Sequence, residues 1–303
     1  MITWVVGSGG LLGSALARQL GTTFTAHPVP WNDPQRAAEH LACEVERFAS
    51  NAQGERWAII WAAGAATTSS SPRDAESELE PLRGLLNGMR THLVDTDGHF
   101  FLTSSAGGAF ANSVDPPFTW KTPAQPLSPY GELKVAQENL VAEMLAGSVP
   151  VTVGRVSNLY GPGQDLGKLQ GLISRLALAS ITRQPINIFV PLDTIRDYIY
   201  VDDAARTISR ILAMRYGSSN PVQTEIVASG SPTTVGQLIK MMNLVTRKQV
   251  PVALGSHPSA RSQALDLRLV PSVSIIAPTP LPVGAKSIHM DILSRLQRHS
   301  KSA

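Results

Sequence analysis

The chain has 303 residues, of which 43% are hydrophobic and 16% are charged, and this predicts a globular protein with one large domain and a smaller one. Its net charge of +3 comes without a basic stripe or a nucleic-acid-binding module, so nucleic acid is not an expected partner. Because no long apolar run and no basic-then-apolar leader occurs, we expect a cytoplasmic protein with no membrane insertion.

The first predicted elements are a strand, a glycine-rich turn and a helix. Ile2–Val6 is an apolar run, Gly7–Gly13 carries the glycines, and a helical pattern of leucine and alanine follows from Leu12. Glycines let a backbone approach a diphosphate closely, and a helix N-terminus offers it free N–H groups and a positive dipole end. This context favours a dinucleotide site over a merely structural turn. The expected cofactor contacts here are Gly7, Gly10, Leu11, Leu12 and Gly13.

The second predicted strand, Thr22–Ala26, lacks the acid that often holds the adenosine ribose in dinucleotide-binding folds. No Arg for a 2′-phosphate stands there either, which favours NAD and leaves NADP as the alternative. Asn32 or Asp33 before Pro34 is expected to cap a helix that runs to about Ser50, so Asp33 is expected to cap rather than to bind the ribose. In that helix Cys43, the single cysteine, excludes an internal disulfide and is expected to face the core.

Two further apolar runs, Trp57–Ala62 and His99–Thr103, are predicted as buried strands, with an amphipathic helix at Leu79–Leu93 between them. Open α/β sheets bind ligands at the carboxyl ends of their strands. Small residues after the first run let a cofactor lie close, and the expected contacts are Ala62, Ala63 and Gly64. After the second run, Ser104 or Ser105 places a hydroxyl where it can hydrogen-bond a reacting oxygen. The alternative is that both serines only form a turn.

Tyr130 and Lys134 lie one helical turn apart on one face of a predicted helix. The Lys ammonium stabilises phenolate over phenol, which proton transfer to or from a substrate hydroxyl or carbonyl requires, and it can also hold a ribose hydroxyl. Alone, such a pair also fits an ordinary helix surface. Its place after the glycine turn and the serines favours an acid/base role.

The order of these elements predicts an α/β fold, a Rossmann-type doubly wound parallel sheet with a small C-terminal substrate lobe. A strand at Val149–Val156 leads into a loop with Asn158, and from about Tyr216 the content of Ser, Pro and Thr rises. No spacing typical of metal ligands occurs. The dinucleotide-binding domain is expected to comprise residues 1–165 and about 195–215, and the lobe about 166–194 and 216–303.

Together these motifs resemble the extended short-chain dehydrogenase/reductase family, and within it the NAD-dependent sugar-nucleotide epimerase/dehydratase group. The resemblance covers about residues 1–210 and rests on four features in the family's order: Gly7-x-x-Gly10-x-x-Gly13, Ser105, Tyr130-x-x-x-Lys134 and the Arg155-x-x-Asn158-x-Tyr160-Gly161-Pro162-Gly163 loop. It implies NAD as the cofactor and three catalytic residues. Tyr130 would be the acid/base, Lys134 would bind the nicotinamide ribose, and Ser105 would orient the sugar hydroxyl that is oxidised.

The resemblance also implies how a nucleotide sugar is bound. Asn158 is similar to the family's substrate-contacting Asn, and Arg196 to the Arg that meets the nucleotide diphosphate. Arg261, from the lobe, adds positive charge for the same group. Each residue has an alternative. Asn158 can cap the following turn, Arg261 can be a surface residue, and Arg196 can pair with Asp193 or Asp197.

The chain departs from the family's pattern at several positions. The acid of the second strand is missing, Trp31 stands near the place where an Asp would bind adenine, and Ser77 or Glu78 replaces the Asn that often begins the next helix. Ser104 is an alternative to Ser105 as the aligned hydroxyl. The family's dehydratases carry Thr-Asp-Glu where this chain has Ser-Ala-Gly from Ser105, and without the two acids water elimination is disfavoured.

The predicted function is an NAD(P)-dependent sugar-nucleotide epimerase that acts through a transient keto-sugar. An NADP-dependent nucleotide keto-sugar reductase would use the same residues, so the sequence separates these two functions poorly. A non-enzymatic nucleotide-sensing protein is a further alternative, but it has no need of a matched acid/base pair. The expected partner is the nucleotide-sugar substrate, and a homodimer is left open.

Overall fold

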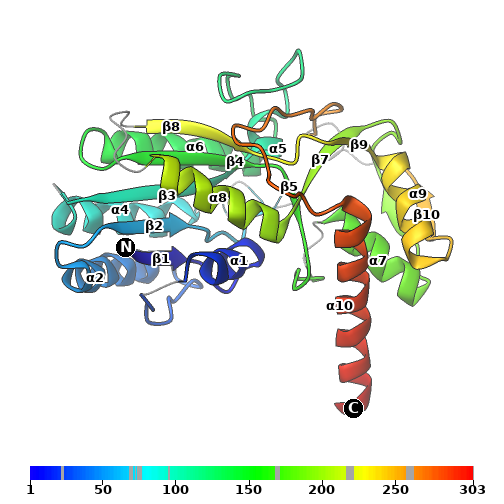
Figure 1. The fold of residues 1–303 in the computed structure, drawn as a ribbon, viewed down its shortest axis with the longest axis horizontal. Helices are drawn as coiled ribbons and strands as arrows, with labels where there is room; N and C mark the ends of the chain where they lie inside the picture. Colours follow the sequence, from blue (N-terminus) through cyan, green and yellow to red (C-terminus); the bar gives the residue numbers. More distant parts are fainter. Residues whose placement is uncertain are drawn as a thin grey trace.

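The structure is a computed structural model that describes residues 1–21, 24–67, 71, 73, 77–94, 96–167, 171–215, 222–256 and 263–302, with side chains as far as residue 298. A five-stranded sheet forms its larger part (Figure 1). In spatial order the strands are β1 (Ile2–Val6), β2 (Trp57–Trp61), β3 (Gly98–Ser105), β4 (Val151–Val156) and β8 (Val222–Val227). Neighbouring strands all pair in parallel, so their carboxyl ends meet at one edge of the sheet.

Helices cover both faces of this sheet (Figure 1). On one face lie α2 (Pro34–Ala52), α4 (Leu79–His92) and α6 (Pro129–Leu145), and on the other lie α1 (Leu11–Leu20) and α8 (Val201–Arg215). Successive strand residues feed the two cores alternately, so Ile59 packs in the first and Ile60 in the second. The predicted doubly wound parallel sheet is therefore confirmed.

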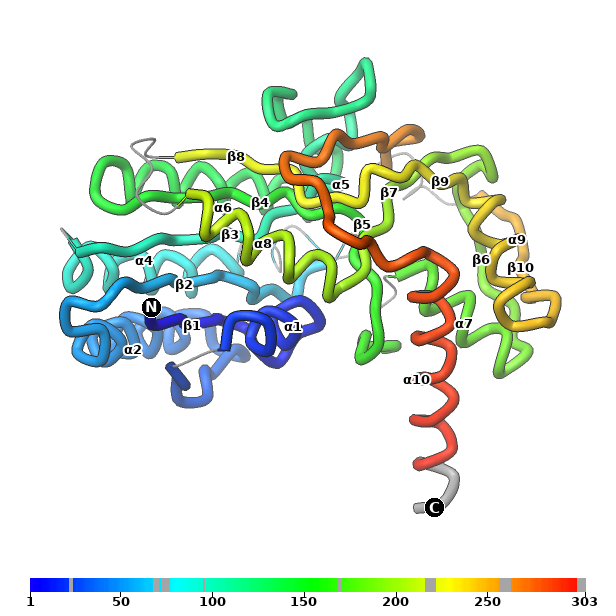
Figure 2. The backbone as a smooth tube through the Cα atoms, viewed as in Figure 1, coloured from blue at the N-terminus to red at the C-terminus, as the bar shows by residue number. Residues whose placement is uncertain are grey.

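A smaller lobe lies beside the carboxyl edge of the sheet (Figure 2). Its elements are β5 (Asn158–Tyr160), α7 (Leu172–Thr182), β6 (Ile186–Ile188), β7 (Ile195–Tyr200), β9 (Pro232–Thr234), α9 (Val235–Thr246), β10 (Val252–Leu254) and α10 (Leu281–Ser302). Helix α10 packs on α7 and α9 and then projects from the lobe, with the C-terminus at its far end. None of the helices in the described ranges is long and apolar enough to cross a membrane.

Some expectations about the strands are wrong. Strand β8 pairs with β4 in the main sheet, although the sequence placed everything from residue 216 onward in the lobe. Strands β5 and β7 pair with each other and with β9 in a separate sheet of the lobe, although the sequence placed them in the dinucleotide-binding domain. Phe24–Ala26 form no regular strand, while Thr22 and Thr23 lie outside the described residues. The Phe24 N–H still donates to the Thr3 carbonyl, so this segment runs beside the outer edge of β1.

Helix α2 begins where the sequence predicts, but it turns a different side to the core than the sequence predicts. Asp33 is its N-cap and accepts the Arg36 N–H, and Pro34 stands in its first turn. The expectation that Cys43 faces the core is wrong, because Cys43 is exposed. Position 43 lies on the opposite side of the helix from the residues that α2 buries, among which are Leu41, Val45 and Phe48.

His99 is a buried titratable group in β3. It is 2% exposed, and its Nε2 lies 2.9 Å from Thr152 Oγ1. Burial, and secondly the charge of Arg215, lower the pKa of His99 from 6.5 to about 4. Between these pH values the unfolded chain binds a proton that the folded chain does not bind. The resulting contribution to stability is complete above pH 6.5 and is lost as the pH falls towards 4.

We therefore expect the free energy of unfolding to fall between pH 6.5 and 4, by at most about 3 kcal/mol from this group. Urea denaturation at a series of pH values measures the effect, and a His99→Gln variant should show a shallower fall. His92→Gln, which changes an exposed histidine at the end of α4, is the control and should keep the original pH dependence. Equal pH dependence in the His99→Gln variant and the unmodified protein would contradict this role of His99.

Candidate active site

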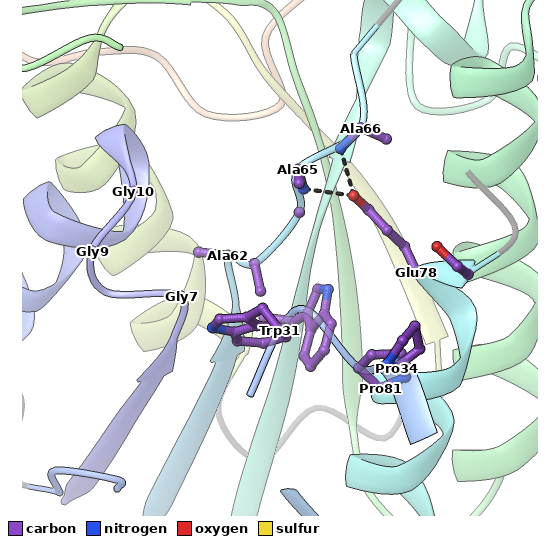
Figure 3. A pocket seen from close by; sticks show the side chains of 14 residues that line it. Gly7, Gly9, Gly10, Trp31, Pro34, Ala62, Ala65, Ala66, Glu78 and Pro81 are labelled. Carbon is purple, nitrogen blue, oxygen red and sulfur yellow. Dashed lines mark hydrogen bonds between the residues drawn. The ribbon is translucent and has the colours of Figure 1, made fainter. Parts of the chain in front are cut away.

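A cavity of about 600 Å³ opens at the carboxyl ends of β1 and β2. The glycine turn, the segment after β2 and the first residues of α2 and α4 border it (Figure 3). The lining residues are Gly7, Gly9, Gly10, Trp31, Pro34, Trp61, Ala62, Ala63, Gly64, Ala65, Ala66, Ser77, Glu78 and Pro81. Five of the predicted cofactor contacts therefore line this cavity, namely Gly7, Gly10, Ala62, Ala63 and Gly64. The remaining ones from the turn, Leu11, Leu12 and Gly13, form the start of α1.

The turn requires glycine because backbone segments touch there. A Cβ on Gly7, whose φ is +87°, would lie 2.6 Å from the Ala63 nitrogen. A Cβ on Gly13 would lie 2.1 Å from the Gly7 carbonyl oxygen. Gly10, which lines the cavity, is the N-cap of α1, so the helix N-terminus opens onto the cavity. This close cradle with a helix N-terminus fits the diphosphate of a dinucleotide.

Two aromatic side chains of the cavity were not among the predicted cofactor contacts. Trp31 is 47% exposed, whereas Trp61, at the end of β2, is 2% exposed. Their ring centres are 6.2 Å apart and their planes meet at 77°. The sequence indicated Trp31 only as a departure from the acid expected nearby. A single aromatic residue in the segment between the first two helices is the signal that could have identified Trp31 as a surface for a flat ligand.

Glu78 holds the segment that follows β2. Its Oε1 accepts the backbone N–H groups of Ala65 and Ala66, as the dashed lines in Figure 3 mark, and it makes no side-chain cap on α4. A Cβ on Gly64 would lie 3.3 Å from Glu78 Oε2 and 3.6 Å from Lys134 Nζ. A carboxylate and an ammonium therefore approach the same glycine. Sequence reasoning missed this role of Glu78, because the contact joins residues from different elements.

Tyr130 and Ser105 meet across Gly108. A Cβ on Gly108 would lie 3.3 Å from the Tyr130 ring carbon Cε1 and 3.4 Å from Ser105 Oγ. Lys134, which is 7% exposed, places its Nζ 5.8 Å from the centre of the Tyr130 ring and donates to Gln137 Oε1 at 3.0 Å. The structure thus brings the three predicted catalytic side chains, those of Ser105, Tyr130 and Lys134, to one place beside the cavity.

The two serines at the end of β3 have different surroundings. Ser104 is 5% exposed and donates to Glu138 Oε1 at 2.5 Å, and the Arg155 guanidinium binds the same carboxylate. Ser105 Oγ accepts the Gly108 N–H at 3.1 Å and caps the short helix α5 (Ala106–Ala109). Accepting that bond leaves the Ser105 hydroxyl hydrogen to be donated to a ligand. This geometry favours Ser105 over Ser104 as the substrate-facing hydroxyl.

Arg196 is a partly buried cation in the lobe. Its guanidinium donates to neutral acceptors, which are the carbonyls of Ile195 and Ala264 and the side chain of Gln263. Burial lowers the pKa of Arg196, and the charges of Tyr198 and Asp266 oppose this. The alternative of a pair with Asp197 does not hold, because the Asp197 carboxylate accepts from Ser229 and Ser231. In the described ranges Arg196 makes no ion pair with Asp193 either.

Asn158 and Arg261 are the other predicted substrate residues. The Asn158 side-chain amide donates to the Asp197 carbonyl at 2.8 Å and so links β5 to β7. This bond supports a structural role and leaves the amide oxygen for a ligand. Arg261 lies outside the described residues. No group of His, Cys, Asp and Glu side chains within the described ranges could hold a metal ion.

Comparison with curated proteins gives partial matches. The dTDP-L-rhamnose 4-epimerase of Burkholderia thailandensis is 33% identical over 95 residues, which is 31% of this chain and 26% of the relative. The dTDP-4-dehydro-6-deoxyglucose reductase of Escherichia coli is 28% identical over 172 residues, which is 54% of this chain and 52% of the relative. The chain therefore spans only about a quarter to a half of the length of these relatives.

Comparison with solved structures and with family models covers more of the chain. A UDP-glucose 4-epimerase from Bifidobacterium longum, solved in complex with NAD+ and UDP, has a TM-score of 0.78 at 17% identity, over 97% of this chain and 98% of that one. The model of the NAD dependent epimerase/dehydratase family matches residues 3–223. The prediction of NAD as the cofactor is confirmed at the level of this family. The chain belongs to the NAD dependent epimerase/dehydratase family.

Proposed function

We propose that the protein is an NAD-dependent nucleotide-sugar epimerase that acts through a transient keto-sugar. The observation that carries this proposal is the meeting of Tyr130, Ser105 and Lys134 beside a cavity that fits a dinucleotide. A phenol, a hydroxyl and an ammonium at the carboxyl edge of a parallel sheet are the groups that removal of a proton from a sugar hydroxyl requires.

The chain's own residues account for the proton transfer. Tyr130, as phenolate, removes the proton of a sugar hydroxyl, and Ser105 donates a hydrogen bond to the same oxygen and so fixes its position. The positive charge of Lys134 stabilises the phenolate before the transfer. The chemistry that bound NAD supplies is reversible acceptance of a hydride from the sugar carbon that bears this oxygen. Once the sugar has turned, Tyr130 returns its proton to the oxygen, and no cofactor is consumed.

Arg196 supports a substrate with a diphosphate. Its guanidinium is bound by neutral oxygens and has no carboxylate in direct contact among the described residues, so an anionic ligand would compensate its charge. Arginine also suits bidentate contacts with phosphate oxygens. Curated relatives are named for dTDP-sugars, and the solved neighbour holds UDP. These features favour a nucleotide-linked sugar over a free sugar.

A nucleotide keto-sugar reductase is the second candidate. The relative with the wider match, the Escherichia coli enzyme, is named a reductase, and such an enzyme would use the same Ser105, Tyr130 and Lys134. A dehydratase is disfavoured, because Ala106 and Gly107 stand where that group carries two acids. Ala106 is fully buried and neither residue has a side chain that can transfer a proton.

Replacement of Tyr130 by Phe should lower kcat by about 10²- to 10⁴-fold, the usual effect of losing a general acid/base. The cofactor should still bind, because the turn and the cavity are unchanged. Tyr200→Phe is the matched control, since the Tyr200 hydroxyl lies 3.3 Å from Ser287 Oγ on α10, away from the cavity. Steady-state kinetics together with a measurement of bound cofactor test this role. Full turnover in Tyr130→Phe would refute it.

The two serines should respond differently to replacement by Ala. Ser105→Ala removes a donor to the reacting oxygen and should lower kcat by about 10²-fold. Ser104→Ala removes a buried hydrogen bond to a carboxylate and should destabilise the fold by about 1–3 kcal/mol while kcat is kept. Thermal denaturation and turnover, measured on both variants, separate these outcomes. The reverse pattern would assign the substrate-facing hydroxyl to Ser104.

A panel of UDP-, GDP- and dTDP-sugars, followed by NMR with and without added NADPH, tests the reaction itself. Stereochemical interconversion without net cofactor consumption is the expected result. Release of the bound cofactor by denaturation and its identification by mass spectrometry should give NAD. Stoichiometric oxidation of NADPH would instead support the reductase. The absence of turnover with every sugar, in protein shown to hold its cofactor, would defeat both functions.

A further inference from the structure

We infer that the purine of the dinucleotide is held by stacking on Trp31 and is not read by a discriminating polar side chain, so that the cofactor site accepts other purines beside adenine. The inference rests on the proposed function only in placing a dinucleotide in the cavity. It concerns the end of the cofactor that takes no part in the chemistry.

The order of the sheet fixes which end of the dinucleotide meets Trp31. The glycine turn follows β1, Gly64 follows β2, and Ser105 follows β3, so the reactive groups lie on the β3 side of the turn. A dinucleotide with its diphosphate on the turn and its nicotinamide near Tyr130 must extend its purine in the other direction. That direction leads to the segment that contains Trp31, because the preceding Phe24 runs along the outer edge of β1.

Trp31 offers an aromatic face on this side of the cavity. Its side chain lines the cavity and is 47% exposed, although tryptophan side chains are usually buried to a greater extent. The planes of the Trp61 and Trp31 rings meet at 77°, so Trp61 does not stack on Trp31. The segment is held in shape, because the Trp31 N–H donates to the Val29 carbonyl and the Asp33 N–H to the Pro30 carbonyl. A flat base can thus stack on a surface that is already in place.

The cavity wall around Trp31 has few groups that could distinguish one purine from another. The neighbouring side chains of the lining are apolar and come from Pro34, Trp61, Ala62 and Pro81. Trp61 Nε1 is buried, so its N–H, the indole donor nearest to Trp31, is not presented to a base in the cavity. No carboxylate of the described lining near Trp31 is placed to accept from the 6-amino group of adenine.

The carboxylate of the lining, that of Glu78, already accepts hydrogen bonds from the protein's own backbone. Glu78 is engaged with the Ala65 and Ala66 N–H groups and approaches Gly64 together with Lys134, on the side of the reactive groups. Figure 3 shows the Glu78 side chain reaching towards these amides. Stacking is tolerant of base identity because every base has an aromatic face. Tolerance of purines follows from a stacked base and from a lining carboxylate that is already hydrogen-bonded elsewhere.

Isothermal calorimetry on the full-length chain, freed of bound nucleotide, tests the inference with two dinucleotides. NAD and nicotinamide hypoxanthine dinucleotide, which has a 6-oxo group in place of the 6-amino group, should bind within about threefold of each other. Trp31→Ala should weaken both by about 10- to 100-fold, as expected for the loss of one stacked base, and Trp31→Phe should restore most of the affinity. Nicotinamide mononucleotide lacks the purine and should bind Trp31→Ala and the unmodified protein equally.

Trp120→Ala is the matched control. Trp120 is also exposed, at 50%, but its ring lies by Lys121 and outside the cavity, so both affinities should be unchanged. The inference is overturned if the hypoxanthine dinucleotide binds more than about 30-fold more weakly than NAD, if Trp31→Ala leaves both affinities intact, or if the unmodified protein binds neither. None of these results depends on a sugar substrate. A failure of the epimerase proposal with intact, purine-tolerant binding would therefore be distinguished from a failure of this inference.

Discussion

The position of the phenol in this site depends on the contact of two backbones. A Cβ on Gly131 would lie 2.5 Å from the Gly108 carbonyl oxygen, and a Cβ on Gly108 would lie 3.2 Å from the Gly131 Cα. Because neither residue has a side chain, the short helix α5 touches the first turn of α6. Ser105 caps α5 and Tyr130 precedes Gly131, so this single contact brings the hydroxyl and the phenol together. The order Tyr-Gly in the sequence is thus part of the site as much as the spacing of Tyr and Lys.

A buried ion pair supports this contact from the interior. Arg155 of β4 donates through two nitrogens to Glu138 of α6, and Ser104 of β3 donates to the same carboxylate. The ions are 7% and 8% exposed, and removal of two charges from water offsets much of their attraction. The Arg155–Glu138 pair therefore contributes less to the stability of the fold than to the positions of the elements that it joins. It ties two strands to the helix that carries Tyr130 and Lys134, and thereby fixes their distance from the sheet edge.

Local patterns were sufficient to predict much of this arrangement. The strand and glycine turn at Gly7–Gly13, the cap at Asp33 and the helix that begins near Tyr130 are encoded by neighbouring residues, and the structure has them where the sequence places them. Features set by pairing over long distances were not predictable in this way. Strand β8 joins the main sheet because β4 has a free edge, a fact that its own residues do not encode. Cys43 was misplaced because a short helical window leaves the phase of the buried face undetermined.

The site residues show the same division. Ser105, Tyr130 and Lys134 belong to short motifs, and the structure brings their side chains together as those motifs predict. Trp31 and Glu78 have no motif and become visible only through the cavity that they line. The sequence indicated Arg196 as a candidate phosphate-binding residue. That Asp197 does not pair with it in the described ranges could be learned only from the structure, in which Ser229 and Ser231 donate to the Asp197 carboxylate.

Gly64 lines the cavity at a point that both Glu78 and Lys134 approach. Lys134 is buried beside this glycine, and an ammonium removed from water is unfavourable unless a negative charge lies near. The Glu78 carboxylate approaches the same glycine, and its Oε2 is buried without a hydrogen-bond partner in the described part of the chain. A side chain at position 64 would separate the two charges. The absence of a side chain at position 64 leaves room for both charged groups, while Glu78 Oε1 holds the Ala65 and Ala66 N–H groups.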